Sequence, residues 1–224
     1  MSTLKRISVF CDFDGTITES DNIINIMKKF NPHGWETIKN DILTKRTSIR
    51  EGVGRMFSLL PSSSREEITH YAIKQSNIRT GFNRFIQYCQ DNNIRLFITS
   101  GGIDFFVLPI LSSYPIPKNN IYCNSCDFSG KQMRVIWPFS CDALCKNDCG
   151  MCKPSILRSL STNDDMKIVI GDSITDLEVS KLADLVIARG FLLQKCKEQS
   201  LPYKKFDSFL DVINILEEKF KQTY

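Results

Sequence analysis

The chain has 224 residues, with 29 Lys and Arg against 25 Asp and Glu, so its formal net charge at neutral pH is only +4. There is no long run of like charges, so this small excess does not predict binding to nucleic acid or to a membrane surface. It does suit a small anionic molecule as partner. No apolar run reaches the roughly 18 residues of a membrane span, and the start of the chain lacks the order of a signal peptide, so the sequence predicts a cytoplasmic protein. The length suffices for one α/β domain with an insertion.

The first predicted strand is an apolar run over residues 7–10 that leads directly into two acidic residues, Asp12 and Asp14. A Gly-Thr pair then turns the chain, so both carboxylates should be exposed at the carboxyl end of the strand, where ligands of open α/β sheets bind. Two carboxylates about 4 Å apart repel by roughly 4 kcal/mol at an effective dielectric constant of about 20, so such a pair needs a cation or a shared proton. An Asx turn at Asp14 is the alternative that involves no chemistry.

Residues 19–80 carry their apolar side chains at helical spacing. Pro32 and Pro61 interrupt this pattern and separate the predicted helices. The sequence therefore predicts a helical cap, inserted between two pieces of one α/β core at residues 1–18 and 81–224.

The α/β pattern resumes after the insertion. Strands are predicted at residues 94–99, 166–170 and 185–188, helices at 81–91, 105–111 and 209–220, and a β-hairpin followed by a Cys-rich loop at about 121–152. This alternation predicts an α/β fold with a Rossmann-like parallel sheet, helices on both faces, and the helical cap inserted after the first strand.

Further polar residues follow the later strands, and in a parallel sheet they would meet the two carboxylates at one edge. Ser100 begins a predicted Ser-Gly-Gly turn that opens a helix, Lys153 precedes another helix, and Asp172 and Asp176 follow the strand at residues 166–170. Taken singly, each residue is more often part of a turn or a surface charge. Their order and strand context together indicate phosphoryl transfer with a carboxylate nucleophile.

The acidic residues can be given distinct roles in such a reaction. Asp12 would attack phosphorus and become an acyl phosphate, while Asp14, kept protonated by its charged neighbour, would protonate the leaving oxygen and later activate water. Because Mg²⁺ prefers oxygen ligands, Asp12, the backbone carbonyl of Asp14 and Asp172 would bind it. Asp176, at a helix start, would hold a metal-bound water or a backbone amide.

The phosphate group itself needs hydrogen-bond donors and a cation. Ser100 and the backbone amides of Gly101 and Gly102 would donate to its oxygens at the positive end of the predicted helix. Lys153 would neutralise part of its charge.

Four of the nine cysteines, Cys141, Cys145, Cys149 and Cys152, lie in one loop with three, three and two residues between them. This spacing is not that of a standard zinc finger, but it is within reach of a tetrahedral structural Zn²⁺. Reduced or packed thiols are one alternative, and disulfides, which the cytosol disfavours, are another. The sequence leaves the three states open. Since Lys153 follows directly, whatever ties the loop should also position that lysine.

Four features follow one another along the chain: Asp-x-Asp-Gly-Thr, a strand that ends in Ser, a Lys, and Gly-Asp-Ser-x-x-Asp. In this order they resemble the haloacid dehalogenase superfamily over nearly the whole chain. The resemblance implies Mg²⁺-dependent hydrolysis of phosphoric monoesters and a four-helix cap like that of phosphoserine-phosphatase-like members. It carries over the roles of Asp12, Asp14, Ser100, Lys153 and Asp172. An Asp at the second acidic position argues against the dehalogenases and the transport ATPases, which lack it.

Four further segments resemble a narrower group of this superfamily, the phosphatases of the methionine salvage pathway. They are residues 21–27, 52–57, 100–106 and 152–155. This likeness implies that phosphate is removed from an enol phosphate with a methylthioalkyl tail. Such a substrate needs an apolar wall, for which Met56 and Phe57 are candidates, with Glu19 or Arg55 near its polar end. Met56 and Phe57 could instead form the core of the cap.

Other functions remain open from the sequence. Within the enzyme class, the alternative is a phosphoserine phosphatase or another small-metabolite phosphatase. Outside it, the chain could be a zinc-loop or phosphate-binding interaction module. The predicted partner is a small phosphorylated metabolite, with neither nucleic acid nor membrane, and a homodimer is left open.

Overall fold

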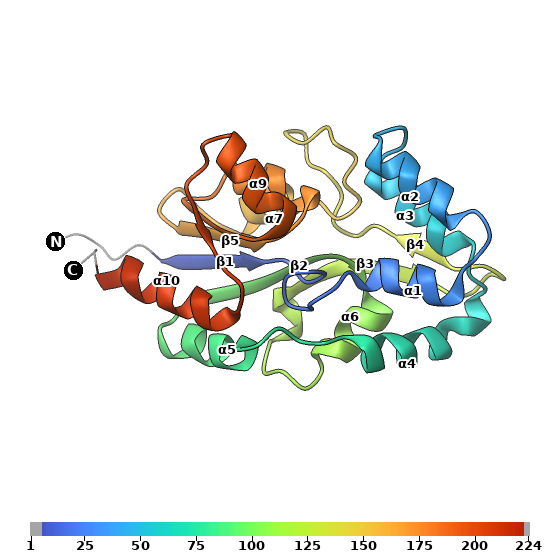
Figure 1. The fold of residues 1–224 in the computed structure, drawn as a ribbon, viewed down its shortest axis with the longest axis horizontal. Helices are drawn as coiled ribbons and strands as arrows, with labels where there is room; N and C mark the ends of the chain where they lie inside the picture. The colour runs from blue at the N-terminus through green and yellow to red at the C-terminus, as the bar shows by residue number, and fades with distance from the viewer. Residues whose placement is uncertain (1–5, 222–224) are drawn as a thin grey trace.

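A seven-stranded sheet in the order β4-β3-β2-β1-β5-β6-β7 lies at the centre of the computed structural model, which describes residues 6–221 (Figure 1). All neighbouring strands are parallel except β3 and β4, which form the predicted antiparallel hairpin. The strands are β1 (Ile7–Cys11), β2 (Arg95–Ile103), β3 (Ile121–Asp127), β4 (Arg134–Ile136), β5 (Met166–Gly171), β6 (Leu185–Ala188) and β7 (Tyr203–Lys205). The predicted core also takes in residues 1–5 and 222–224, which lie outside the described residues.

Helices cover both faces of this sheet. Those of the described chain are α1 (Asn22–Phe30), α2 (Trp35–Leu43), α3 (Ile49–Ser58), α4 (Arg65–Gln75), α5 (Phe82–Asp91), α6 (Asp104–Leu111), α7 (Lys153–Leu160), α8 (Leu177–Ser180), α9 (Gly190–Glu198) and α10 (Phe209–Lys221). Figure 1 shows α7 and α9 on one face and α5, α6 and α10 on the other. Between residues 6 and 221, none of the helices is long and apolar enough to cross a membrane.

Strand β1 shows why two helix layers are needed. Successive side chains of a strand point to opposite faces. Val9 and Cys11 are buried in the core on one face, while Phe10 is buried on the other, where its ring stacks on that of Phe97 with 5.3 Å between centroids. A strand that is apolar on both faces is stable only between two layers of helices. The predicted α/β fold class is therefore confirmed.

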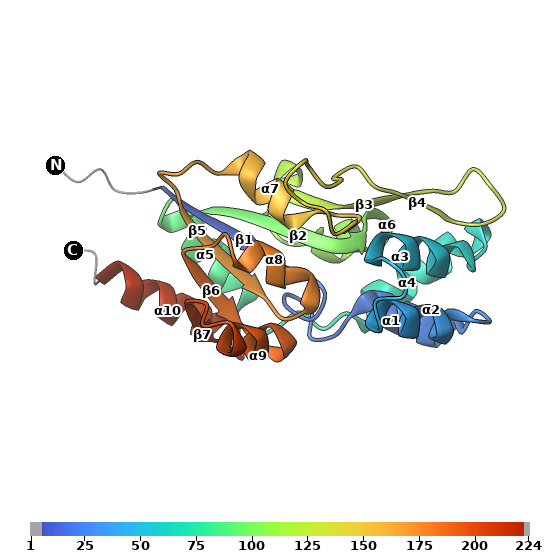
Figure 2. The same cartoon turned by 90° about the horizontal axis from the view of Figure 1, so that it is seen from above.

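Helices α1 to α4 occupy the predicted insertion. Figures 1 and 2 show them together at the end of the molecule opposite both termini, beside the β3–β4 hairpin. The chain enters and leaves this helical group along two adjacent segments, because Thr18 and Ile78 form an antiparallel bridge. The N–H of Glu19 donates to the Asn77 carbonyl over 2.9 Å. The division into a core and a cap domain at residues 19 and 80 stays a prediction.

A second connection joins the helical group to the β3–β4 hairpin. Pro61 forms an isolated antiparallel bridge with Gln132. The N–H of Ser62 donates to the Lys131 carbonyl over 2.9 Å, and the N–H of Met133 donates to the Leu60 carbonyl over 3.0 Å. The turn between α3 and α4 is therefore bonded through its backbone to the hairpin.

Two parts of the core differ from the sequence prediction. The predicted turn at Ser100-Gly101-Gly102 is wrong, because β2 continues through these residues to Ile103 with an irregularity in its pairing to β3. The side-chain amide of Asn124 in β3 donates to the Gly101 carbonyl over 2.8 Å and so holds the strand where the glycines would allow a turn. The sequence prediction also lacked α9 and β7, of which β7 pairs with β6 and completes the sheet.

Asp165 is a buried carboxylate that ties the start of β1 to the turn before β5. It accepts two hydrogen bonds from the Arg6 guanidinium, at 2.7 and 3.0 Å, and one from the N–H of Thr162 at 2.8 Å. The hydrogen bond from Arg6 is the main cause that lowers the pKa of Asp165 to about 2. We expect Asp165→Asn to lower the free energy of unfolding by about 1–2 kcal/mol at neutral pH, as measured by urea denaturation.

The pH dependence of this loss has a defined sign. A folded pKa below the unfolded value of about 3.9 stabilises the fold above that pH, and the stabilisation disappears as the pH falls towards the folded pKa. The difference between Asp165→Asn and the unmodified chain should therefore shrink as the pH is lowered to about 3. The neighbouring Asp164 is exposed, so Asp164→Asn is the matched control and should change stability little at either pH. An equal loss in both variants would contradict the prediction.

Candidate active site

The carboxyl ends of three adjacent parallel strands bring the predicted residues to one edge of the sheet. Asp12 and Asp14 follow β1, Ser100 lies in the last part of β2, and Asp172 follows β5. Strand β1 lies between β2 and β5, so its two acidic residues stand at the centre of the edge. The convergence that parallel strands require is therefore present.

Lys153 lies between two buried carboxylates. Its Nζ is 2.5 Å from Asp12 Oδ1 and 2.6 Å from Asp176 Oδ1, and all three side chains are at most 5% exposed. The lysine is the first residue of α7, and Pro154, which suits the start of a helix, directly follows it. The helix start thus directs the lysine side chain towards the end of β1.

The burial of these charges shifts their protonation. Burial alone would lower the pKa of Lys153, but the charges of Asp12 and Asp176, together with hydrogen bonds to both, raise it above its ordinary value. Burial and the charge of Asp176 raise the pKa of Asp12 well above its usual range, against the opposing charge of Lys153. The lysine therefore stays a cation, and full ionisation of the carboxylates around it would leave more negative charge than this one cation compensates.

A divalent cation fits this excess of negative charge. Asp12, Asp172 and Asp176 can each offer a carboxylate oxygen, and these atoms lie within 4.8 Å of one another. Burial and the charge of Asp176 raise the pKa of Asp172 to about 6, although the Thr16 hydroxyl donates to it over 3.1 Å. A set of hard oxygen donors is the kind that Mg²⁺ prefers. The residues present thus fit the predicted metal.

Asp176 has a different environment from that of the other two carboxylates. Its Oδ2 accepts the N–H of Asp172 over 3.2 Å and the N–H of Ser173 over 3.1 Å, and Ser173 closes a capping box with it. These bonds fix the turn after β5 and leave Oδ1 for Lys153. Asp176 therefore orients both the lysine and the loop that carries Asp172.

Asp14 is hydrogen-bonded to the first residue of α1, in the insertion. Its Oδ1 accepts the backbone N–H of Asn22 over 3.0 Å and the side-chain amide of the same residue over 2.7 Å. Burial and the charge of Asp21 raise the pKa of Asp14 to about 7, although both bonds from Asn22 oppose the shift. A carboxyl group with such a pKa can both give and take a proton near neutral pH. A Cβ at Gly102 would lie 3.0 Å from Asp14 Oδ2, so the glycine leaves room for this side chain.

Two residues that hold the loop after β1 could not be found from the sequence. The sequence marks Asn22 only as one of residues 21–27, without a role of its own, yet it fixes Asp14. Arg79 is 6% exposed, and its guanidinium donates to the carbonyls of Gly15, Thr16 and Thr18 at 2.7 to 3.2 Å. No local motif marks Arg79, because its partners lie more than sixty residues earlier in the chain.

The phosphate-binding candidates also lie at this edge. Ser100 is fully buried, and its Oγ accepts the N–H of Gly102 over 2.9 Å. Open space faces Gly101, since a Cβ there would meet no atom within 4 Å. Their contact with phosphate stays a prediction.

The four candidates for substrate contact in the cap are not brought together. Met56 and Phe57 are buried in the core, where Phe57 packs edge-on against Phe105. Arg55 is exposed and lines a cavity of about 350 Å³ with Trp137 and Asp148, between α3 and the Cys-rich loop. Glu19 is exposed beside the bridge that enters the insertion. The roles of these four residues in substrate binding stay predictions.

One class of hydrolases is defined by a parallel sheet with two acidic residues after its central strand, together with a buried lysine and further carboxylates after a later strand. Residues 9–181 match the family described as HAD, haloacid dehalogenase-like hydrolase, and the chain belongs to this family. The predicted family and the predicted enzyme class, a phosphoric monoester hydrolase, are confirmed. The alternative of an interaction module without catalysis is thereby set aside.

Curated relatives resemble the chain over almost its whole length. The 2-hydroxy-3-keto-5-methylthiopentenyl-1-phosphate phosphatase of Geobacillus kaustophilus is 54% identical over 95% of this chain and 96% of its own length. The protein of the same name from Brevibacillus brevis is 50% identical over 96% of each chain. A solved structure titled as a phospho-aspartyl intermediate analogue of phosphoserine phosphatase has a TM-score of 0.70 at 18% identity, covering 94% of this chain and 99% of its own. That last likeness concerns the fold alone.

Proposed function

We propose that this chain hydrolyses 2-hydroxy-3-keto-5-methylthiopentenyl-1-phosphate to 1,2-dihydroxy-3-keto-5-methylthiopentene and phosphate, with Mg²⁺ bound. The substrate is proposed from the relatives named above, which are 50% and 54% identical over nearly the whole chain. The reaction is carried by one observation, the buried Asp12 held by Lys153 at the centre of the strand ends. In methionine salvage, this step would yield the product that a later oxidation consumes.

Asp12 is the proposed nucleophile. Its Oδ1 is bound to Lys153, so its other oxygen would attack phosphorus, and the bond from phosphorus to the substrate oxygen would break. The product of this step is an aspartyl phosphate and the free organic product. Lys153 would stabilise the negative charge that gathers on the phosphoryl oxygens, because its ammonium is already fixed and desolvated.

Asp14 is the proposed acid and base. With a pKa of about 7, its carboxyl group can give a proton to the leaving oxygen. The carboxylate formed would then take a proton from the water that attacks the aspartyl phosphate, which releases inorganic phosphate and restores Asp12. The two bonds from Asn22 would hold Asp14 in place for both transfers.

The metal would be held by Asp12 and Asp172, together with the backbone carbonyl of Asp14. When bound, Mg²⁺ would neutralise charge on the phosphoryl group and on the cluster of carboxylates. Asp176 would keep its bonds to Lys153 and to the loop that carries Asp172. Ser100 and the amide of Gly101 would donate to the remaining phosphoryl oxygens.

The proposed substrate is tested by Mg²⁺-dependent phosphate release from the enol phosphate, generated in situ, against phosphoserine and a panel of sugar phosphates. We expect kcat/KM for the enol phosphate to be larger by at least about 100-fold, since an apolar tail and a fixed polar end can supply roughly 3 kcal/mol of discrimination. A preference for phosphoserine or a sugar phosphate would overturn the substrate and keep the hydrolase class.

The role of Asp14 is tested by Asp14→Asn with 4-nitrophenyl phosphate, whose leaving group needs no proton. Steady turnover should fall by about 10² to 10⁴-fold, because no base remains to activate water. The first step should survive better than the second, so rapid mixing should show a burst of about one nitrophenol per chain before slow turnover. Asp164→Asn, which changes an exposed acidic residue before the amino end of β5, is the control and should turn over normally. Loss of turnover without a burst would contradict the proposed role in the second step.

A further inference from the structure

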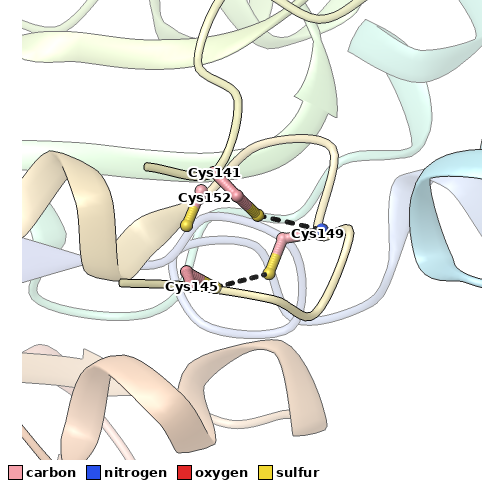
Figure 3. Close-up of side chains that lie close together, drawn as sticks. All are labelled: Cys141, Cys145, Cys149 and Cys152. Carbon is pink, nitrogen blue, oxygen red and sulfur yellow. Dashed lines mark hydrogen bonds between the residues drawn. The ribbon is translucent and has the colours of Figure 1, made fainter. Parts of the chain in front are cut away.

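The four cysteines at positions 141, 145, 149 and 152 gather around one point in the loop between β4 and α7. Their sulfur atoms all lie within 4.8 Å of one another. Figure 3 shows the side chains directed towards the same small volume from different parts of the loop. The Sγ atoms of Cys145 and Cys149 are 3.8 Å apart.

Ordinary packing does not account for this arrangement. Cysteines that fill a core are surrounded by apolar side chains, as Cys11 and Cys89 are in this protein. The Cys-rich loop instead has mostly polar, exposed residues between its cysteines; of its two large apolar side chains between them, Leu144 is 77% exposed and only Met151 is buried. Neither a helix nor a strand occurs between residues 137 and 152, all of them described. Four sulfurs therefore converge in a segment that has no regular secondary structure and only one buried large apolar side chain between its cysteines.

The distances match a metal site better than a disulfide. In a tetrahedral site with Zn–S bonds of about 2.3 Å, neighbouring sulfurs are about 3.8 Å apart, and a disulfide bond is about 2.05 Å long. The separation of 3.8 Å between Cys145 and Cys149 agrees with the edge of such a tetrahedron. All four sulfurs lie close enough to one another to be its corners.

Hydrogen-bond donors around the sulfurs also suit thiolate ligands. The backbone N–H of Cys149 points at Cys141 Sγ over 3.5 Å, and the hydroxyl of Ser155 donates to Cys152 Sγ over 3.0 Å. Donors of this kind, one shell beyond the metal, orient thiolates and spread their charge. From the convergence, the spacing and these donors, we propose that Cys141, Cys145, Cys149 and Cys152 bind one structural Zn²⁺ per chain.

The zinc would affect catalysis only by fixing the position of Lys153. Cys152 immediately precedes Lys153, and the Cys152 N–H donates to the Phe139 carbonyl over 2.8 Å, so the zinc would fix the start of α7. On its other side the loop contacts the insertion, where Asp148 accepts the hydroxyl of Ser48 at the start of α3 over 2.6 Å. The zinc site would therefore hold together the segment between the buried lysine and the helical group.

The test is the metal content of the full chain, purified without a tag or chelator and measured by mass spectrometry. About one zinc per chain is expected, and cobalt substitution should give the intense visible bands of tetrahedral thiolate coordination. Less than about 0.1 zinc per chain, with four freely titrating thiols or with a disulfide in the loop, would overturn the proposal.

Variants assign the ligands. Cys145→Ser and Cys149→Ser should each lower the bound zinc at least about tenfold, whereas Cys126→Ser, a partly buried cysteine outside the loop, should keep it. If the ligand variants do not fold, the cobalt spectrum of the unmodified chain still decides the matter. Neither readout depends on which phosphate ester the enzyme hydrolyses, so failure of the zinc site and failure of the proposed substrate are distinguishable.

Discussion

Replacement of Asp12 by Asn is expected to lower phosphate release by at least about 10⁴-fold, because an amide cannot form the aspartyl phosphate. The substitution keeps the size and shape of the side chain, and Lys153 can still donate to the remaining oxygen. Phosphate release under saturating Mg²⁺ measures the loss. Acid quench followed by peptide mass spectrometry should find phosphate on Asp12 in the unmodified chain and none in the variant.

Two comparisons make this result specific. Asp164→Asn changes the charge equally before the amino end of β5, away from the edge formed by the carboxyl ends of β1, β2 and β5, and it should retain both turnover and the phosphorylated peptide. The thermal unfolding midpoint of Asp12→Asn should stay close to that of the unmodified chain. Turnover within about tenfold of normal in a folded Asp12→Asn variant would rule out the aspartyl phosphate route.

Lys153→Met is expected to impair both activity and stability. Phosphate release should fall by at least about 10³-fold, since the cation next to the attacking carboxylate is lost. Without added metal, the free energy of unfolding should fall by about 3–5 kcal/mol, because Asp12 and Asp176 stay buried beside each other with no compensating charge. Urea denaturation of the metal-free protein measures this second effect.

The pH and metal dependence separate this charge effect from lost packing. A carboxyl group whose folded pKa is raised destabilises the fold as the pH rises above its unfolded pKa, so Lys153→Met should be less destabilised at about pH 5 than at about pH 8. Added Mg²⁺ should restore part of the stability, because the proposed metal site exists only in the folded state. Lys181→Met removes an exposed lysine paired with Glu178 and should cost at most about 0.5 kcal/mol. If the loss of unfolding free energy in Lys153→Met depended on neither pH nor Mg²⁺, lost packing would be its cause instead.

The central part of the site could be predicted because it depends on local sequence. An apolar run followed by Asp12 and Asp14 defines a strand end, and the same logic places Asp172 after β5. In a parallel sheet those ends must meet, so the convergence needs no knowledge of distant contacts. Only the fold shows that β1 is the middle strand between β2 and β5.

The rest of the site depends on contacts between distant segments. Nothing near Ser100 in the sequence shows that Asn124 binds the Gly101 carbonyl and that β2 continues through the two glycines. The pairing of Lys153 with Asp176 as well as Asp12, and the bonds from Asn22 to Asp14, likewise join residues whose neighbours give no signal of the partner. Strand β7 was missed because Tyr203, Lys204 and Lys205 are all exposed and lack the apolar pattern of a buried strand.

The two connections between the helical group and the core restrict how a substrate can enter. If the helical group were joined to the core only at the Thr18–Ile78 bridge, it could rotate about that connection as a hinge. The backbone bonds from Ser62 and Met133 join the same group to the β3–β4 hairpin at a second, separate place. A body held at two places cannot rotate freely about either one, so opening requires the hairpin to travel with the helices or its backbone bonds to break. As long as these backbone bonds persist, the unit that moves must be larger than the inserted sequence and include a ribbon contributed by the core.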